Sequence, residues 1–244
     1  MLNYLEREFK RSGKEGPAKI MDGLLTILGK DIPFPIEGTL GLEQATREYK
    51  NKPTSPELLT RFMQAFWQEA SQKIGRNIVV HEFPLSAKEI KERQKRGEMA
   101  IFVPDGVDRV DLGKMFPKMQ SWAVQKESSA VDVINNSGWL WIEASVDAPN
   151  RNTTQGQLEE KFKKEGKQGQ SLRSYIIGGQ ISKLLTDKYF DEGATWSRLL
   201  CSYDDCGVLD AYFDSGGDLV VNSYWDPGDH RGNMGGRFEE VIKA

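Results

Sequence analysis

Cysteine, histidine and long apolar runs are scarce in this chain, and each scarcity excludes a class of protein. Two cysteines and two histidines occur in 244 residues, and two cysteines are too few for a disulfide framework. No segment approaches the roughly 20 consecutive apolar residues that a membrane-spanning helix needs. The first residues are charged and lack the apolar core of a signal peptide. We therefore expect, by default, a cytoplasmic protein without membrane insertion.

An excess of basic charge and the common catalytic motifs are also missing. The formal net charge is −3 and the sequence pI is about 5.6. Non-specific nucleic-acid binding depends on clustered lysine and arginine. The basic clusters at 88–96 and 161–167 are interleaved with glutamate, which is typical of solvated helix faces. The chain also has no G-x-S-x-G elbow, no P-loop and no H-E-x-x-H motif. These observations argue against a nucleic-acid partner and against the enzyme classes that these motifs define.

The most informative absence lies between Leu199 and Arg237, where lysine, glutamate and glutamine do not occur. The preceding segment, 154–198, contains all three. A solvated surface normally carries interspersed lysine and glutamate. A β-meander rich in glycine and aspartate explains a turn such as 215–218, but it does not explain the loss of these three residue types.

Mutation of adenines in asparagine codons does account for the missing residue types. An AAY codon encodes Asn. When its two adenines vary, the reachable residues include Asn, Asp, Tyr, His, Cys, Ser, Gly, Arg and Val, but never Lys, Glu, Gln, Met or Trp. The polar residues of the run belong to the reachable set. Between them stand residues that we interpret as scaffold: Leu199, Leu200, Gly207, Val208, Phe213, Gly216, Gly217, Leu219, Trp225, Pro227, Met234, Gly235, Gly236 and Arg237.

The C-terminal segment resembles the variable region of target proteins of diversity-generating retroelements. The resemblance extends from the TWSRLL sequence at 195–200 to the GGRF sequence at 235–238 and is weak before Thr195. In that family a reverse transcriptase copies a template with adenine-specific errors, and the product overwrites the 3′ end of the target gene. Many members end in Gly-Phe-Arg, whereas this chain has Gly-Gly-Arg-Phe, a difference that bears on the strand register.

The resemblance implies a C-type lectin fold of the formylglycine-generating-enzyme type that displays varied side chains and has no catalytic activity. We expect a helical N-terminal extension at 1–75, a C-type lectin-like domain at 76–244 and a variable region at about 199–237. The implied partner is a macromolecule, a protein, and no cofactor is implied. The predicted ligand-binding residues are Tyr203, Asp204, Asp205, Asp210, Tyr212, Asp214, Asn222, Tyr224, Asp226, Asp229, His230 and Asn233.

Local sequence signals predict helices first, then mixed elements, then short strands, which is the order of an α+β protein. Ser55 followed by Pro56 predicts a helix to about residue 74. Ser86 with Glu89 predicts a capped helix to about residue 96. Two short helices are expected within 1–30, and others at 154–165 and 171–185. Strands are expected at 77–83, 99–103, 137–144, 208–213, 219–225 and 237–242.

Strand alternation predicts which residues of the run are displayed. Side chains two residues apart lie on the same face of a strand. Asp210 and Tyr212 alternate with apolar residues in 208–213. Asn222, Tyr224 and Asp226 likewise alternate with a second set, which is Val221, Ser223 and Trp225. We expect the first set in each strand to be exposed to solvent and to bind ligand, and the second set to face the core.

Two other hypotheses remain open. Cys201 and Cys206 have the C-x4-C spacing of the copper-binding pair in formylglycine-generating enzymes, and soft thiolates select Cu(I). The alternative function is therefore a copper oxidase of that type, although the flanking Arg-Gly-Gly-Ser pattern is absent and an asparagine codon can reach both cysteines. The third hypothesis is a structural or assembly protein that uses the fold without diversification. We expect that folding depends on neither calcium nor copper.

Overall fold

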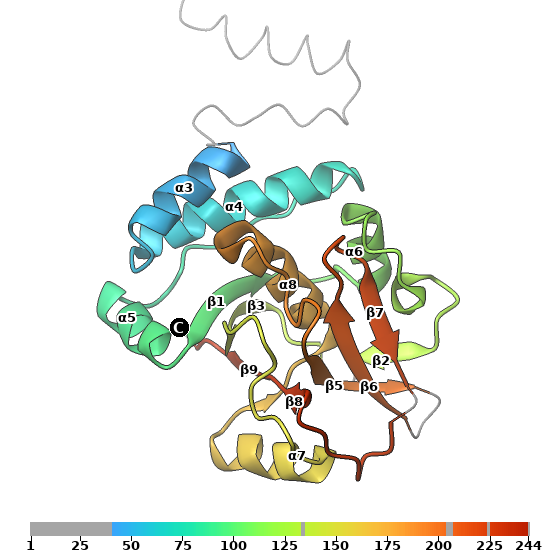
Figure 1. The fold of residues 1–244 in the computed structure, drawn as a ribbon. Coiled ribbons are helices and arrows are strands. Elements are labelled where there is room, and N and C mark those ends of the chain that lie inside the picture. Colours follow the sequence, from blue (N-terminus) through green and yellow to red (C-terminus); the bar gives the residue numbers. More distant parts are fainter. Residues whose placement is uncertain (1–40, 133–134, 204–206, 224, 244) are drawn as a thin grey trace, which may run out of the picture. The chain divides into compact units, whose positions relative to one another are not determined.

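The computed structural model describes residues 41–132, 135–203, 207–223 and 225–243, and of residues 201–203 and 207 it describes the backbone alone. The chain separates into two compact units, Met1–Thr39 and Leu40–Ala244, and every described residue belongs to the second. The helices expected within 1–30 therefore lie outside the described residues. The second unit combines helices with two β-sheets (Figure 1), so the predicted α+β class is confirmed.

The compact unit begins well before the expected domain boundary at residue 75. Helices α3 (Leu42–Asn51) and α4 (Pro56–Gln72) belong to the same unit as both sheets. In α4, Trp67 is fully buried, and its Nε1 donates a hydrogen bond of 2.9 Å to the carbonyl oxygen of Phe102. These two helices are therefore part of the core rather than of an extension.

Capping residues place the predicted helix starts correctly. Helix α4 follows Ser55, whose side chain accepts a hydrogen bond from the Leu58 amide at 3.3 Å. Helix α5 (Ala87–Lys95) begins with the expected reciprocal bonds between Ser86 and Glu89. Helix α7 (Gln155–Lys164) likewise follows a capping threonine, Thr154. By contrast, α3 lies in a segment for which no helix was predicted.

The strand expected at 77–83 is wrong. This segment runs beside α4, and side chains satisfy several of its backbone groups. The Phe83 amide donates to the Thr60 hydroxyl at 2.9 Å, and the His81 carbonyl accepts from Trp139 Nε1 at 3.1 Å. A strand needs a neighbouring strand to complete its ladder, and here side chains take that place.

The remaining predicted strands belong to two sheets. The four-stranded sheet has the antiparallel order β1 (Glu98–Val103), β3 (Gly138–Glu143), β9 (Phe238–Val241) and β4 (Gln168–Gly169). The second sheet has the order β2 (Ala130–Asp132), β5 (Trp196–Tyr203), β6 (Gly207–Phe213) and β7 (Leu219–Asn222). In that sheet β8 (Met234–Gly236) pairs in parallel with β5. The short elements α6 (Arg109–Met115) and η2 (Trp122–Val124) complete the unit.

Helix α8 (Leu172–Thr186) packs against both sheets, which explains the two glycines in its middle. A Cβ atom at Gly178 would lie 2.7 Å from Ile142 in β3, and one at Gly179 would lie 2.4 Å from the ring of Phe213 in β6. The missing side chains let the helix approach both sheets closely. The core therefore lies around α8, and strands β5, β6 and β7 turn only one of their faces toward it.

Candidate functional site

One face of strands β5, β6 and β7 turns away from the core, and Asp210, Tyr212, Val220 and Asn222 of the predicted variable region lie on it. In β6, Leu209, Ala211 and Phe213 are fully buried on the core side. The alternating residues of the three strands form what we call the outer face. It consists of Trp196, Arg198, Asp210, Tyr212, Val220 and Asn222. Strand register places Arg198, Asp210 and Asn222 in one row across the sheet.

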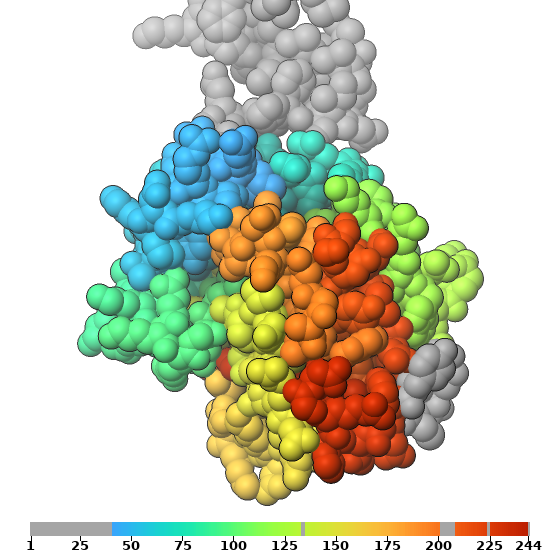
Figure 2. All heavy atoms as spheres, in the orientation of Figure 1, coloured from blue at the N-terminus to red at the C-terminus, as the bar shows by residue number. Residues whose placement is uncertain are grey.

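Residues 225–233 connect β7 to β8 and form what we call the display loop. Asp226, His230, Arg231 and Asn233 in this loop are exposed. In Figure 2 the red C-terminal part of the chain covers the lower right of the molecule, next to the yellow segment that leads into α7. The display loop therefore presents a set of polar side chains at one end of the outer face.

Main-chain hydrogen bonds attach the display loop to the rest of the protein. The Pro227 carbonyl accepts from the Gln155 amide at 3.0 Å, the Arg231 carbonyl from the Asn152 amide at 3.1 Å, and the Asn233 carbonyl from the Trp196 amide at 2.8 Å. Carbonyl oxygens are present whatever the side chain. These three attachments are therefore independent of which side chains the loop displays.

Arg198 holds the display loop from beneath. The residue is 2% exposed. Its Nη2 donates to the Asp229 carbonyl at 2.7 Å and its Nη1 to the Pro227 carbonyl at 3.3 Å. Its Nε lies 3.2 Å from the sulfur of Met234 and 3.6 Å from a carboxylate oxygen of Asp210. Arg198 thus links the sheet to the loop, again through main-chain acceptors.

The solvent exposure predicted for Asp210 is wrong. The strand alternation is right, because Asp210 points away from the core, but the residue is 0% exposed beneath Arg198 and near the display loop. Burial raises the pKa of its carboxyl from 3.8 to about 7; the nearby Arg198 opposes this shift and Asp229 adds to it. Asp210 therefore cannot contact a ligand in this arrangement.

The other predicted ligand-binding residues differ in exposure and in position. Asp226, His230 and Asn233 are exposed, as expected, and Tyr212, Asn222 and Asp229 are half-buried around the outer face and the loop. Asp214 is also half-buried, but it lies in the turn at the opposite end of the β6–β7 hairpin, where its Oδ1 accepts from the Gly216 and Asp218 amides. The predictions for Asp204, Asp205, Tyr224 and the side chain of Tyr203 lie outside the described residues.

Two aromatic contacts lie at the site, and the one made by Trp225 differs from the expected arrangement. Trp225, expected to face the core, is half-buried beyond the end of β7, and the Arg231 guanidinium lies 3.8 Å from its ring centroid. Trp196 packs edge-on against Tyr212 with ring centroids 4.3 Å apart. Val221, expected to face the core, is buried.

Sequence reasoning missed Trp196 and Arg198 as members of the site because they precede the run without lysine, glutamate and glutamine. The signal was present in the alternation of 196–199. Ser197 and Leu199 are buried on the core side, which leaves Trp196 and Arg198 to face the other way.

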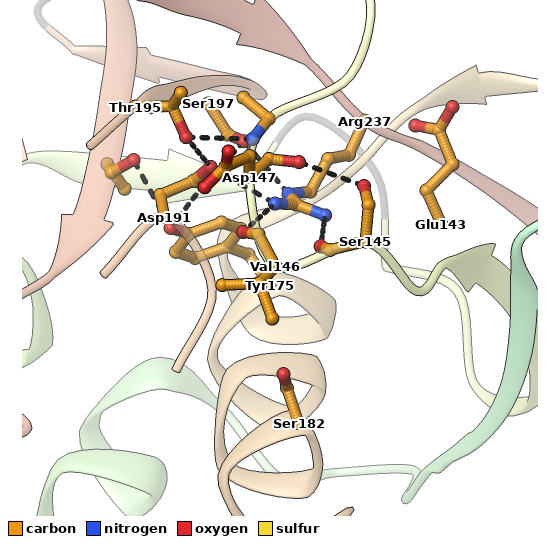
Figure 3. A network of polar contacts seen from close by, with 12 residues as sticks. Glu143, Ser145, Val146, Asp147, Tyr175, Ser182, Asp191, Thr195, Ser197 and Arg237 are labelled. Atoms are coloured by element: carbon orange, nitrogen blue, oxygen red, sulfur yellow. Dashed lines mark hydrogen bonds and ion pairs between the residues drawn. The ribbon is translucent and has the colours of Figure 1, made fainter. Parts of the chain in front are cut away.

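A buried polar network supports the site from the core side (Figure 3). The Asp191 carboxylate accepts from the hydroxyls of Tyr175, Thr195 and Ser197 at 2.9, 2.6 and 2.7 Å and pairs with Arg237 at 3.1 Å. Arg237 also donates to the carbonyls of Ser145 and Val146. The network thus joins β5 to the Gly-Gly-Arg-Phe segment. Each of these groups has a hydrogen-bond partner and both charged residues are fully buried, which is typical of a structural element.

Among the residues that the structure describes, no group of three or more histidine, cysteine, aspartate or glutamate side chains is placed to hold a metal ion. Cys206 and the side chain of Cys201 lie outside that set, so the copper-oxidase alternative concerns residues whose geometry is not described.

Comparisons with protein-family models, with curated proteins and with solved structures find no match to this chain. In the described part of the chain, no helix is both long and apolar enough to cross a membrane.

The main-chain attachment of the display loop leads to a first prediction. Replacing His230 and Asn233 together by serine should change the free energy of unfolding by no more than about 0.5 kcal/mol per residue, because both side chains are exposed surface groups. Thermal unfolding of the double variant measures this. Arg198→Ala is the matched comparison and should melt clearly lower, because it removes buried donors to the loop. Equal melting of the two variants would contradict the assignment of Arg198 as the support of the loop.

Proposed function

We propose that this chain is a hypervariable ligand-binding protein whose region at about 199–237 is diversified by a retroelement through adenine-specific mutagenesis. The proposal includes a C-type lectin-like fold as the scaffold and a protein as the partner. It rests on the resemblance of the C-terminal segment, on the composition of that segment and on the exposure of its residues.

The observation that carries the proposal is the solvent exposure of the run that lacks lysine, glutamate and glutamine. Burial would be an ordinary reason for their absence, since charged residues are seldom buried. Burial does not apply to Asp226, His230, Arg231 and Asn233, which are exposed. In α7, by contrast, exposed positions carry the usual lysine and glutamate. A limited set of reachable codons explains an exposed surface with this composition.

The division between scaffold and displayed residues also supports the proposal. Several residues interpreted as scaffold from the sequence are buried, namely Leu199, Phe213, Gly217, Leu219, Met234, Gly235, Gly236 and Arg237. The displayed loop is attached through carbonyl oxygens. Side chains can therefore vary on this surface at little cost in stability, which a diversified protein requires.

The chemistry of the displayed residues favours a protein partner. Tyrosine and tryptophan offer a large contact area with few rotatable bonds, and Ser, Gly and Asn offer adaptable hydrogen bonds, as in antibody loops. Trp196 and Tyr212 form such an aromatic pair on the outer face. Asp226 and Arg231 add charges that favour specificity and rapid association.

Sequencing the gene in many independent isolates of the host tests the proposal. Substitutions should be concentrated at adenines in the codons of the displayed residues, such as those of Tyr212, Asn222 and Asn233. Codons for exposed residues of α7, such as Glu159 and Lys163, provide the matched control and should remain constant. A reverse-transcriptase gene and an adenine-rich copy of the segment should lie nearby. Substitution at equal rates in α7 and in the run would overturn the proposal.

A further inference from the structure

Asp210 is buried where the outer face meets the display loop, and its carboxylate lacks the partners that a buried charge needs. Neither carboxylate oxygen accepts a hydrogen bond from any residue that the structure describes. The nearest cation is Arg198, whose Nε lies 3.6 Å from one oxygen. The N–H groups of that guanidinium are directed to Met234 and to loop carbonyls instead. A carboxylate without donors in a buried site is costly when ionised.

The charged groups around Asp210 come from the elements packed against it. Strand β5 contributes Arg198, and the display loop contributes Asp229, whose Oδ2 accepts from the Asp226 amide at 3.3 Å. On β7 the register partner is Asn222, which is neutral. His230 and Arg231, also in the loop, are exposed to solvent. Among the residues that the structure describes here, one buried cation thus faces two carboxylates, and ionised Asp210 competes with the loop carbonyls for the donors of Arg198.

We propose that Asp210 is a positioning residue whose ionisation state, acting through Arg198, sets how tightly the display loop is held, so that the loop is firm in mildly acidic solution and loosens in alkaline solution. When Asp210 is protonated, Arg198 remains with the carbonyls of Pro227 and Asp229. When Asp210 is ionised, its carboxylate draws the guanidinium or water toward itself, and the loop loses part of its support.

The sign of the effect follows from the direction of the pKa shift. Burial raises the pKa of Asp210 from 3.8 to about 7 in the folded protein. The folded state therefore binds a proton that the unfolded state has already released, and the corresponding stability is present at low pH and is lost as the pH rises through about 7. Burial also raises the pKa of Asp132 from 3.8 to about 6. Asp132 therefore changes stability in the same direction, so the effect of Asp210 must be measured as a difference between variants.

The inferred change in loop attachment depends only on the contacts of Asp210 and Arg198. A change in ligand binding with pH, by contrast, rests on the proposed function. Loop order is therefore the quantity to measure, because it can confirm or overturn this inference even if the proposed function fails.

Amide hydrogen exchange of residues 226–234 tests the inference. It is followed from about pH 5 to about pH 9, around the range in which Asp210 titrates, and is corrected for the intrinsic rate. In the parent protein, corrected exchange should become at least several-fold faster across this range. Asp210→Asn, a neutral side chain of the same size, should remove most of this change. Asp218→Asn, at the far end of the hairpin, and His230→Asn, which removes the histidine of the display loop, should both retain it.

Three outcomes would overturn the inference. The first is an equal pH dependence in the parent protein and in Asp210→Asn, and the second is no change in the parent protein. The third is loss of the change in His230→Asn, which would assign the effect to His230. If Asp210→Asn fails to fold, an NMR titration of the Asp210 carboxyl in the parent protein decides instead. A midpoint near 7 supports the inference, whereas a midpoint below about 5, close to that of an ordinary aspartate, overturns it.

Discussion

Replacing Arg237 by alanine is expected to lower the free energy of unfolding by about 3–5 kcal/mol, the largest loss that we predict for a single side chain of this protein. Removing one partner of a buried ion pair leaves the other charge uncompensated. Arg237 and Asp191 are both fully buried, and Arg237 also donates to Ser145 and Val146. For a unit of this size, such a loss corresponds to a decrease in melting temperature of about 6–20 °C.

Two variants make the test of Arg237 specific. Arg231→Ala removes an exposed arginine that stacks on Trp225 and should cost about 0.5–1 kcal/mol, the usual size of an exposed cation–π contact. Adding Asp191→Asn to Arg237→Ala should recover part of the lost stability, because it removes the uncompensated charge. Equal melting of the two arginine variants, or strictly additive losses in the double variant, would show that the buried pair does not act as described.

Replacing Gly235 by alanine is expected to disrupt the junction between the display loop and the second sheet. A Cβ atom at this position would lie 2.0 Å from the carbonyl oxygen of Pro149, a main-chain atom that cannot rotate away. The same carbonyl accepts a hydrogen bond from the Gly236 amide at 3.0 Å. The free energy of unfolding should fall by at least as much as is typical of overpacking, about 1–3 kcal/mol. Strand β8 should also lose its pairing with Ser197.

Gly232→Ala is the control for this substitution. Gly232 lies in the same loop, and a Cβ atom there would meet no other atom within 4 Å. Its substitution should leave thermal unfolding nearly unchanged, or raise the melting temperature slightly because the unfolded chain becomes less flexible. If the Gly235→Ala and Gly232→Ala proteins have the same melting temperature, the close approach of β8 to Pro149 is ruled out.

The Gly-Gly-Arg-Phe segment, which includes Gly235, packs closely against the rest of the protein. Gly235 and Gly236 are both buried against main chain or packed side chains, and Arg237 and Phe238 are buried in the core. Close packing therefore constrains all four residues of the Gly-Gly-Arg-Phe sequence. Under the proposed function, this segment fixes the end of the variable region while the residues before it change.

The sequence by itself determined the elements whose signals are local. Helices α4, α5 and α7 begin where Ser55, Ser86 and Thr154 cap them, because a capping side chain bonds an amide only a few residues away. Helix α3 has no such signal, since it begins after Gly41 without a side-chain cap. The absence of lysine, glutamate and glutamine from 199–237 is likewise a property of the sequence alone.

Only the tertiary structure decided which of these elements and residues are covered. Segment 77–83 has the residues of a strand, but α4 and Trp139 occupy its hydrogen-bonding groups. Asp210 lies on the predicted face of β6, yet Arg198 and the display loop cover it. Alternation along a strand tells which way a side chain points. It does not tell what the rest of the chain places over it, because that depends on contacts between residues far apart in the sequence.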